Sequence, residues 1–130
     1  MRNILTLILF AFSAALLTGC GQTKVTGTVT FSDGSPLTSG RIMFENDQRT
    51  YTAAIKDDGT FNMGMLKDGE GIPPGEYRVA VMAIEPGSEN AEKPPLLTHS
   101  KYASSRTSGI TYTIQKNTDV AIVVERPAIR

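Results

Sequence analysis

The chain has 130 residues, and its 13 Lys and Arg balance 13 Asp and Glu. A balanced charge without a cluster of Lys or Arg excludes the basic surface that nucleic-acid-binding proteins use, so we expect no nucleic-acid partner. One His, one Cys and no Trp exclude an internal disulfide and a metal site built from several histidines, and we expect neither cofactor nor metal. The length suits one small domain that depends on core packing.

The first twenty residues have the pattern of an export signal. A positive start at Arg2 is followed by an apolar run, residues 4–17, which is shorter than the ~20 residues that cross a bilayer. The run ends in Leu17-Thr18-Gly19-Cys20, and this ending resembles the lipobox of bacterial lipoproteins. The resemblance implies that residues 1–19 are removed and that Cys20 is lipidated. An uncleaved anchor helix, or an ordinary signal with a chance cysteine, stays open as an alternative.

Lipidation would decide where the protein works. Each buried methylene contributes ~0.8 kcal/mol, so one acyl chain anchors a protein only marginally, whereas lipoproteins of this kind carry two or three chains. We therefore expect a membrane-anchored protein of the cell envelope outside the cytoplasm, with Cys20 and residues 21–23 as a short tether. Gly21 replaces the aspartate that retains many lipoproteins at the inner membrane, which favours an outer membrane where the cell has one.

From Lys24 onward, apolar and polar residues alternate with the period of two that is typical of half-buried strands. Asp58-Gly59 lies between two such runs and predicts a hairpin, because its tight turn needs a positive φ. The alternating runs predict about seven short strands, at 24–31, 41–45, 50–56, 61–65, 76–84, 110–114 and 120–124. We therefore expect an all-β fold: a single antiparallel β-sandwich over residues 24–126.

One long segment, residues 85–108, breaks this alternation. Loops of this length in a small domain are usually functional or disordered. The part from Pro86 to Pro94 is rich in Gly, Ser, Asn and Glu, which predicts a mobile first half. The second half contains apolar residues that predict docking against the sandwich: Leu96, Leu97 and Tyr102.

Several short motifs occur in an order and spacing that a known family shares. They are Val25-Thr26-Gly27-Thr28-Val29, Asp33-Gly34-Ser35-Pro36-Leu37, Gly40-Arg41-Ile42-Met43-Phe44, Asp58-Gly59-Thr60-Phe61, Pro74-Gly75-Glu76-Tyr77-Arg78-Val79, Lys101-Tyr102 and Thr107-Ser108-Gly109-Ile110-Thr111. This series resembles the carboxypeptidase regulatory-like domains, a transthyretin-like (prealbumin-like) family, and in particular small lipoproteins abundant in planctomycete bacteria. The resemblance covers nearly the whole chain after Cys20. It implies a β-sandwich and an envelope location, and it transfers no catalytic residue.

Two candidate sites have simpler explanations. Asp33, Asp57 and Asp58 could act as calcium ligands, but no Asp-x-Asp-x-Asp-Gly series occurs and turn geometry accounts for both Asp-Gly pairs. His99 precedes Ser100, yet adjacent residues do not form a nucleophile and base, and no Gly-x-Ser-x-Gly motif is present. Transthyretin-like hydroxyisourate hydrolases depend on several histidines and a terminal Tyr-Arg-Gly-Ser, whereas this chain ends in residues 127–130, Pro-Ala-Ile-Arg. We therefore nominate no catalytic residue.

The aromatic residues divide between core and loop. Tyr51, Tyr77 and Tyr112 lie on the predicted core faces, whereas Tyr102 lies in the long loop, where docking is favoured. Tyr102 and His99 are the candidates for contact with a partner. The sequence thus predicts a non-catalytic binding or structural module that contacts envelope protein or polysaccharide. The alternatives are a calcium-dependent adhesion module and a hydrolase of unknown substrate. With the Lys24 end near the membrane, distant loops such as 33–39 are better placed for a partner.

Overall fold

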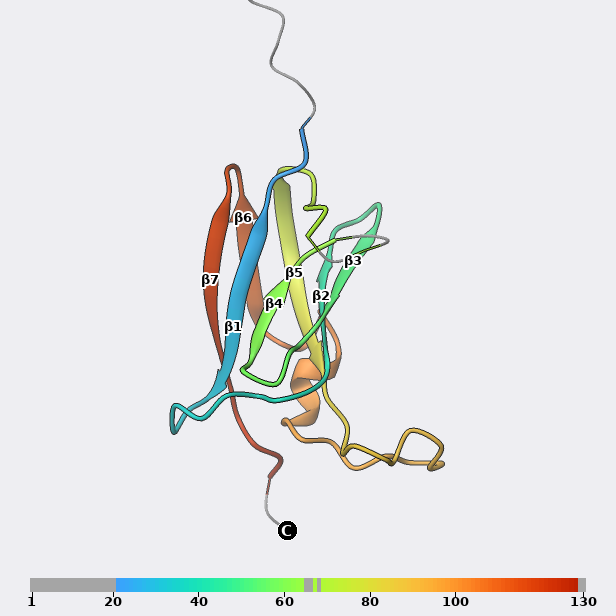
Figure 1. The fold of residues 1–130 in the computed structure, drawn as a ribbon. Coiled ribbons are helices and arrows are strands. Elements are labelled where there is room, and N and C mark those ends of the chain that lie inside the picture. The colour runs from blue at the N-terminus through green and yellow to red at the C-terminus, as the bar shows by residue number, and fades with distance from the viewer. Residues whose placement is uncertain (1–20, 65–66, 68, 129–130) are drawn as a thin grey trace, which may run out of the picture.

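The computed structural model describes residues 21–64, 67 and 69–128, which form two sheets packed face to face (Figure 1). The first sheet has the order β4-β1-β7 and consists of β1 (Val25–Phe31), β4 (Thr60–Asn62) and β7 (Thr118–Val124). The second has the order β3-β2-β5-β6 and consists of β2 (Arg41–Glu45), β3 (Thr50–Ala54), β5 (Gly75–Met82) and β6 (Ile110–Ile114). The predicted all-β sandwich is confirmed. Cys20 and the signal segment before it lie outside the described residues.

Strand β1 shows how alternation builds the sandwich. Its odd-numbered residues point inward and are buried, while its threonines form the half-buried outer face. Gly27 occupies one inward position because a side chain would not fit there. A Cβ on Gly27 would lie 2.4 Å from the backbone oxygen of Val120 and 2.6 Å from the ring of Phe61. The central strand of this sheet therefore requires glycine for close packing.

The β1–β7 pair is parallel, unlike the other strand pairs among the described residues. Its register runs from Val25 opposite Thr118 to Phe31 opposite Val124. The arrangement differs from the purely antiparallel sandwich that we expected. It arises because the chain changes sheet between β6 and β7 and returns beside β1, so that the last strand runs in the direction of the first.

The turn at Asp58-Gly59 forms as predicted, but it does not join neighbouring strands of one sheet. Gly59 has φ 84°, and Lys56 N donates to Thr60 O at 2.9 Å. Strand β3 nevertheless stays in the second sheet, while β4 pairs with β1 in the first. The predicted hairpin therefore forms in part: Thr52 N donates to Gly64 O at 3.0 Å and Gly64 N donates to Thr52 O at 3.3 Å, although β4 with its buried Phe61 belongs to the other sheet. Met65, predicted to continue this strand, lies outside the described residues.

Aromatic rings fill one end of the core between the sheets. Phe44 stacks on Tyr112 with ring centroids 6.1 Å apart, and Tyr51 meets Tyr77 edge-on at 5.9 Å. Each such contact contributes about 0.5–1.5 kcal/mol beyond burial. Tyr77 is fully buried, and its hydroxyl donates to the backbone oxygen of Pro73. The prediction that Tyr51, Tyr77 and Tyr112 pack into the core agrees with this arrangement, although Tyr112 is only half-buried.

The second half of the long loop docks on the sandwich, as predicted. A short 3₁₀ helix, η1 (Ser100–Ala103), packs against β5 and buries Tyr102. Ser108 Oγ donates to Val79 O, and Leu97 N donates to Ala83 O at 2.9 Å. The first half, residues 85–95, is almost entirely exposed and projects from the body in Figure 1. The docked half of the long loop thus covers the outer face of β5 at Ala80.

Candidate functional site

The two ends of the sandwich differ in what they present. The chain emerges at residues 21–24 beside the turn between β6 and β7 (Figure 1). The opposite end, here called the distal end, carries three segments: 32–40, 83–99 and 125–128. A seven-residue strand such as β1 separates the ends by roughly 20 Å, because a strand rises about 3.3 Å per residue. The loop 33–39 predicted to lie far from the tether is at this end.

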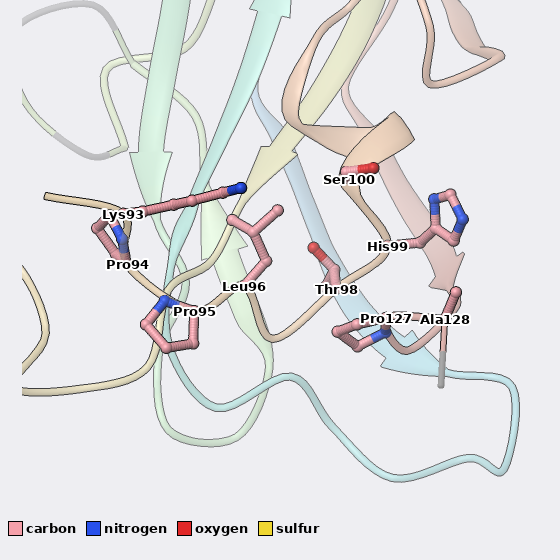
Figure 2. Close-up of a pocket in the computed structure, with 9 residues that line it drawn as sticks. All are labelled: Lys93, Pro94, Pro95, Leu96, Thr98, His99, Ser100, Pro127 and Ala128. Carbon is pink, nitrogen blue, oxygen red and sulfur yellow. The ribbon is translucent and has the colours of Figure 1, made fainter. Parts of the chain in front are cut away.

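Three hollows surround the distal end. The first, of about 350 Å³, lies between residues 93–100 and the C-terminal Pro127 and Ala128 (Figure 2). A second, of about 370 Å³, lies beside Phe31, Leu97 and Arg126. A third, of about 380 Å³, lies beside the base of the projecting loop. Proline and leucine side chains alternate with polar ones around the first hollow, as in binding sites that use shape and few polar groups.

Arg126 ties the C-terminal residues to the β1–β2 loop. Its Nη2 donates to Asp33 Oδ2 at 3.3 Å and to Ser35 Oγ at 3.1 Å, and its guanidinium lies 4.0 Å from the centre of the Phe31 ring. The hydroxyl and backbone N–H of Ser35, together with Arg126, lower the pKa of the Asp33 carboxyl to about 2. These hydrogen bonds favour the ionised form. This contact shapes one wall of the second hollow.

His99 lines the first hollow but also holds the loop in place. Its backbone N donates to Glu125 O at 2.8 Å, and its Nδ1 accepts from Lys101 N at 3.2 Å. The imidazole therefore caps the start of η1, and with Nδ1 as the acceptor, Nε2 is the donor of the neutral ring. No described serine hydroxyl bonds to this imidazole, so the His99-Ser100 neighbours form no nucleophile and base. His99 remains a candidate for contact with a partner.

Tyr102, the other candidate, is 5% exposed. Lys101 Nζ lies 5.0 Å from the centre of its ring and 3.2 Å from Glu125 Oε2. The hydrogen bond that Lys101 Nζ donates to the Glu125 carboxylate is the main reason that the pKa of Lys101 is raised. The burial of Tyr102 favours the docking interpretation over contact with a partner. The sequence alone could not distinguish docking of Tyr102 from contact with a partner, because both require an apolar ring in a loop.

The acidic turn residues serve their own turns. Asp58 Oδ1 accepts from Thr60 N at 3.0 Å and from Thr60 Oγ1 at 2.6 Å, and these bonds lower the pKa of its carboxyl. Asp33 does the same for Ser35. Across residues 21–64, 67 and 69–128, no three His, Cys, Asp or Glu side chains gather as metal ligands would. Asp33 and Asp58 thus use their carboxylate oxygens for hydrogen bonds within their own turns.

A polar hollow that sequence reasoning missed lies nearer the tethered end. It measures about 250 Å³ and is bordered by Asp47, Glu76 and Arg78. Arg78 Nη2 lies 3.4 Å from Asp47 Oδ1 and 3.8 Å from Glu45 Oε1. Glu45 and Arg78 are opposite each other on β2 and β5, so only the strand register could have revealed them. Exposed ion pairs of this kind contribute about 0–1 kcal/mol.

No family model and no curated protein matches the chain. Among solved structures it is similar to a DUF3823 family protein from Bacteroides ovatus, with 19% identity and a TM-score of 0.47, covering 79% of this chain and 44% of that one. It is also similar to a 9R-lipoxygenase from Cyanothece, with 13% identity and a TM-score of 0.37, covering 82% of this chain and 16% of that one. The chain therefore spans less than half of either protein. In the part of the chain that the structure describes, no helix has the length and apolar character needed to cross a membrane.

Proposed function

We propose that this protein is a lipid-anchored, non-catalytic module of the cell envelope that contacts envelope protein or polysaccharide through its distal end. The anchor is Cys20, supported by the export-signal pattern and the lipobox-like ending before it. The observation that supports this role is that the tether and the hollowed loops lie at opposite ends of the sandwich. The residues that follow Cys20 leave from one end, and the hollowed loops lie at the other (Figure 1).

The tether between anchor and sandwich is short. Thr23 N donates to Ile72 O at 2.7 Å, Ile72 N donates to Thr23 O at 2.9 Å, and Thr23 is buried. Thr23 therefore belongs to the folded body, and only Gly21 and Gln22 are exposed between it and Cys20. Two residues reach about 7 Å at full extension. A sandwich held this closely would present its distal end away from the membrane.

The distal end suits binding rather than catalysis. The chain's single His already caps η1 through Nδ1, and the hollow beside it offers prolines, Leu96 and scattered polar groups. Such a surface can be recognised by shape, with a few hydrogen bonds that orient the partner. The hydrogen bonds of Arg126 and His99 to neighbouring segments keep the walls of these hollows in position before a partner arrives. Preorganisation of this kind lowers the cost of binding.

The anchor is tested by Cys20→Ser in the full chain, followed by fractionation of cells. The wild-type protein should remain with the membranes through washes at high salt, whereas Cys20→Ser should give an uncleaved or soluble product. Thr18→Ser, which keeps a small hydroxyl residue before the cysteine, serves as the matched control and should behave as the wild type does. A Cys20→Ser protein that lacked residues 1–19 and still fractionated with lipid would rule out the proposed anchor.

The distal end is tested by crosslinking in whole cells with a photoreactive residue at exposed positions. Replacement of Lys93 or Pro127, beside the first hollow, should yield adducts with an envelope component. Replacement of Glu76, which is exposed near the tethered end, is the control and should yield fewer. Equal adducts at both ends would contradict the proposed orientation.

A further inference from the structure

The first hollow of the distal end contains a buried hydroxyl group without a protein partner. Thr98 lines this hollow and is 2% exposed. The residues on either side of it donate backbone hydrogen bonds to neighbouring segments, whereas no described residue forms a hydrogen bond with the Thr98 hydroxyl. Figure 2 shows its oxygen directed between Leu96 and Ser100. Because buried polar groups are rarely left unpaired, this hydroxyl is a point where a ligand can gain a hydrogen bond.

The other polar side chains around this hollow are also hydrogen-bond donors. Lys93 carries an ammonium group and Ser100 a hydroxyl, and neither side chain bonds to a described residue. His99 accepts from Lys101 N through Nδ1, so its Nε2 carries the hydrogen of the neutral ring. Among the described residues, no carboxylate side chain lines the hollow, and Glu125 directs its carboxylate to Lys101 Nζ at 3.2 Å. Several donors without an acidic group suit an anion.

The rest of the lining is apolar, which gives the anion an organic body. Three prolines contribute most of it, together with Leu96 and Ala128. The hollow measures about 350 Å³, near the lower end of the range of about 300–1,000 Å³ that is typical of ligand pockets. An inorganic ion would leave most of this space unused. The hollow therefore suits a compact group that has an apolar surface beside its negative charge.

The backbone around the hollow is unsuited to an extended peptide. Pro94, Pro95 and Pro127 have no N–H group, and the N–H groups of Leu97 and His99 already donate within the fold. A peptide that adds a strand to a sheet needs such groups. A pyranose ring instead presents C–H groups on its faces and hydroxyls at its rim. A sugar that also carries a carboxylate therefore matches both the apolar and the donor side chains.

We propose that this hollow binds an acidic sugar, a pyranose unit with a carboxylate, of an envelope polysaccharide. Figure 2 shows Lys93 and His99 on opposite sides, with Thr98 between them. Lys93 and Thr98 hold the carboxylate, and Ser100 and His99 bond the hydroxyls at the opposite rim of the ring. The prolines pack against its C–H face. The inference rests on the binding role proposed for the distal end and names its ligand; it does not depend on lipidation.

The test measures binding of acidic sugars to the full chain, purified from cells in a detergent without sugar. The probes are tetramers of galacturonate, glucuronate and mannuronate, each compared with its carboxyl-reduced, neutral form. Calorimetry should show that at least one acidic tetramer binds about tenfold more tightly than its neutral form, since one charge-assisted hydrogen bond is lost. NMR shifts should be confined to residues 93–100 and 127–128. Failure of all three acidic tetramers, or equal binding of the neutral forms, overturns the proposal.

An acidic peptide is the competing ligand, and tetraglutamate tests it directly. It carries the same number of side-chain carboxylates as each acidic tetramer but no sugar ring. We expect it to bind about tenfold more weakly than the best acidic tetramer, because the apolar lining would lack its C–H face. Tighter binding of tetraglutamate overturns the proposal in favour of a protein partner.

Two variants with matched controls place the binding in this hollow. Thr98→Val keeps the shape of the buried side chain and removes its hydroxyl, and Thr28→Val on the outer face of β1 is its control. Lys93→Gln removes the cation, and Lys116→Gln in the turn after β6 is its control. Thr98→Val and Lys93→Gln should each weaken binding of the acidic tetramer about tenfold at an unchanged melting temperature, and neither control should. Unchanged binding in both variants overturns the proposal.

Crosslinking from Pro127 in cells separates this inference from the proposed function. Adducts at the distal end, without binding of any acidic tetramer, would overturn the acidic sugar and leave the proposed binding role in place. Binding of an acidic tetramer that depends on Thr98, together with equal adducts at both ends, would support the acidic sugar and contradict the proposed orientation.

Discussion

Nη2 of Arg126 lies 3.3 Å from Oδ2 of Asp33, so the segment after β7 and the start of the β1–β2 loop are joined at the distal end. The two residues are 93 positions apart in the sequence. Both side chains are exposed, so this ion pair contributes little to the stability of the fold. Its effect is to hold the two segments in position. It holds one wall of a hollow where we propose that a partner is recognised.

The carboxyl of Asp33 should titrate with a pKa of about 2, and NMR titration of its side chain measures this directly. The Ser35 hydroxyl is the largest cause, so Ser35→Ala should raise the pKa more than Arg126→Gln does. Because the pKa is lowered by folding, the associated stability is present above the ordinary value of 3.8 and is lost as the pH falls toward 2. Asp58 is the internal control, since neither variant touches its bonds to Thr60. A larger effect of Arg126→Gln would contradict this order of causes.

Gly27→Ala should destabilise the sandwich by about 1–3 kcal/mol, because the added methyl would meet the backbone of Val120 and the ring of Phe61. Urea denaturation measures the change in the free energy of unfolding. Thr28→Ala, on the opposite face of β1, is the control and should stay within about 0.5 kcal/mol of wild type. Equal effects at both positions would show that β1 does not pack as described.

The residues that sequence reasoning placed well are those decided by local alternation. Val25, Val29 and Phe31 in β1, and Tyr77, Val79 and Val81 in β5, are buried as their period of two indicates. The Asp58-Gly59 turn also follows from local chemistry. Alternation states which face of a strand is buried, and it does not state which sheet the strand joins.

What could not be predicted depends on contacts between distant parts of the chain. Strand β4 pairs with β1 in the sheet opposite to β3, and β7 returns parallel to β1, and both pairings join distant parts of the sequence. The hydrogen bonds between Thr23 and Ile72 and the contact between Arg126 and Asp33 carry no local signal either. The second hollow of the distal end is lined by Arg126 and Ser35, which this long-range contact brings together, so the sequence indicated the loops but not their arrangement.

Tyr102→Ala should release the docked half of the long loop. The ring is 5% exposed, and loss of a buried aromatic side chain costs on the order of 3 kcal/mol. Hydrogen exchange should accelerate at Leu97 and Tyr102, whose amides bond to Ala83 and His99. Tyr102→Phe keeps the ring and should retain protection. If Tyr102→Ala exchanged no faster than wild type, docking of the loop would not depend on this ring.

Calcium at millimolar concentration should leave the melting temperature unchanged. Asp33 and Asp58 bond within their own turns, and the described residues offer no cluster of carboxylates for a cation. A ligand that binds only the folded state raises the melting temperature by linkage. Magnesium at the same concentration controls for ionic strength. An upward shift specific to calcium would instead support the adhesion alternative.

The central claim is that the chain is anchored through Cys20, so that its distal end faces away from the membrane. Mass spectrometry of the N-terminal peptide of the mature protein, isolated from membranes, tests it most directly. The account predicts that residues 1–19 are absent and that the peptide begins at Cys20 with the added mass of acyl chains. A peptide that retained residues 1–19, or one that began at an unmodified Cys20, would contradict it.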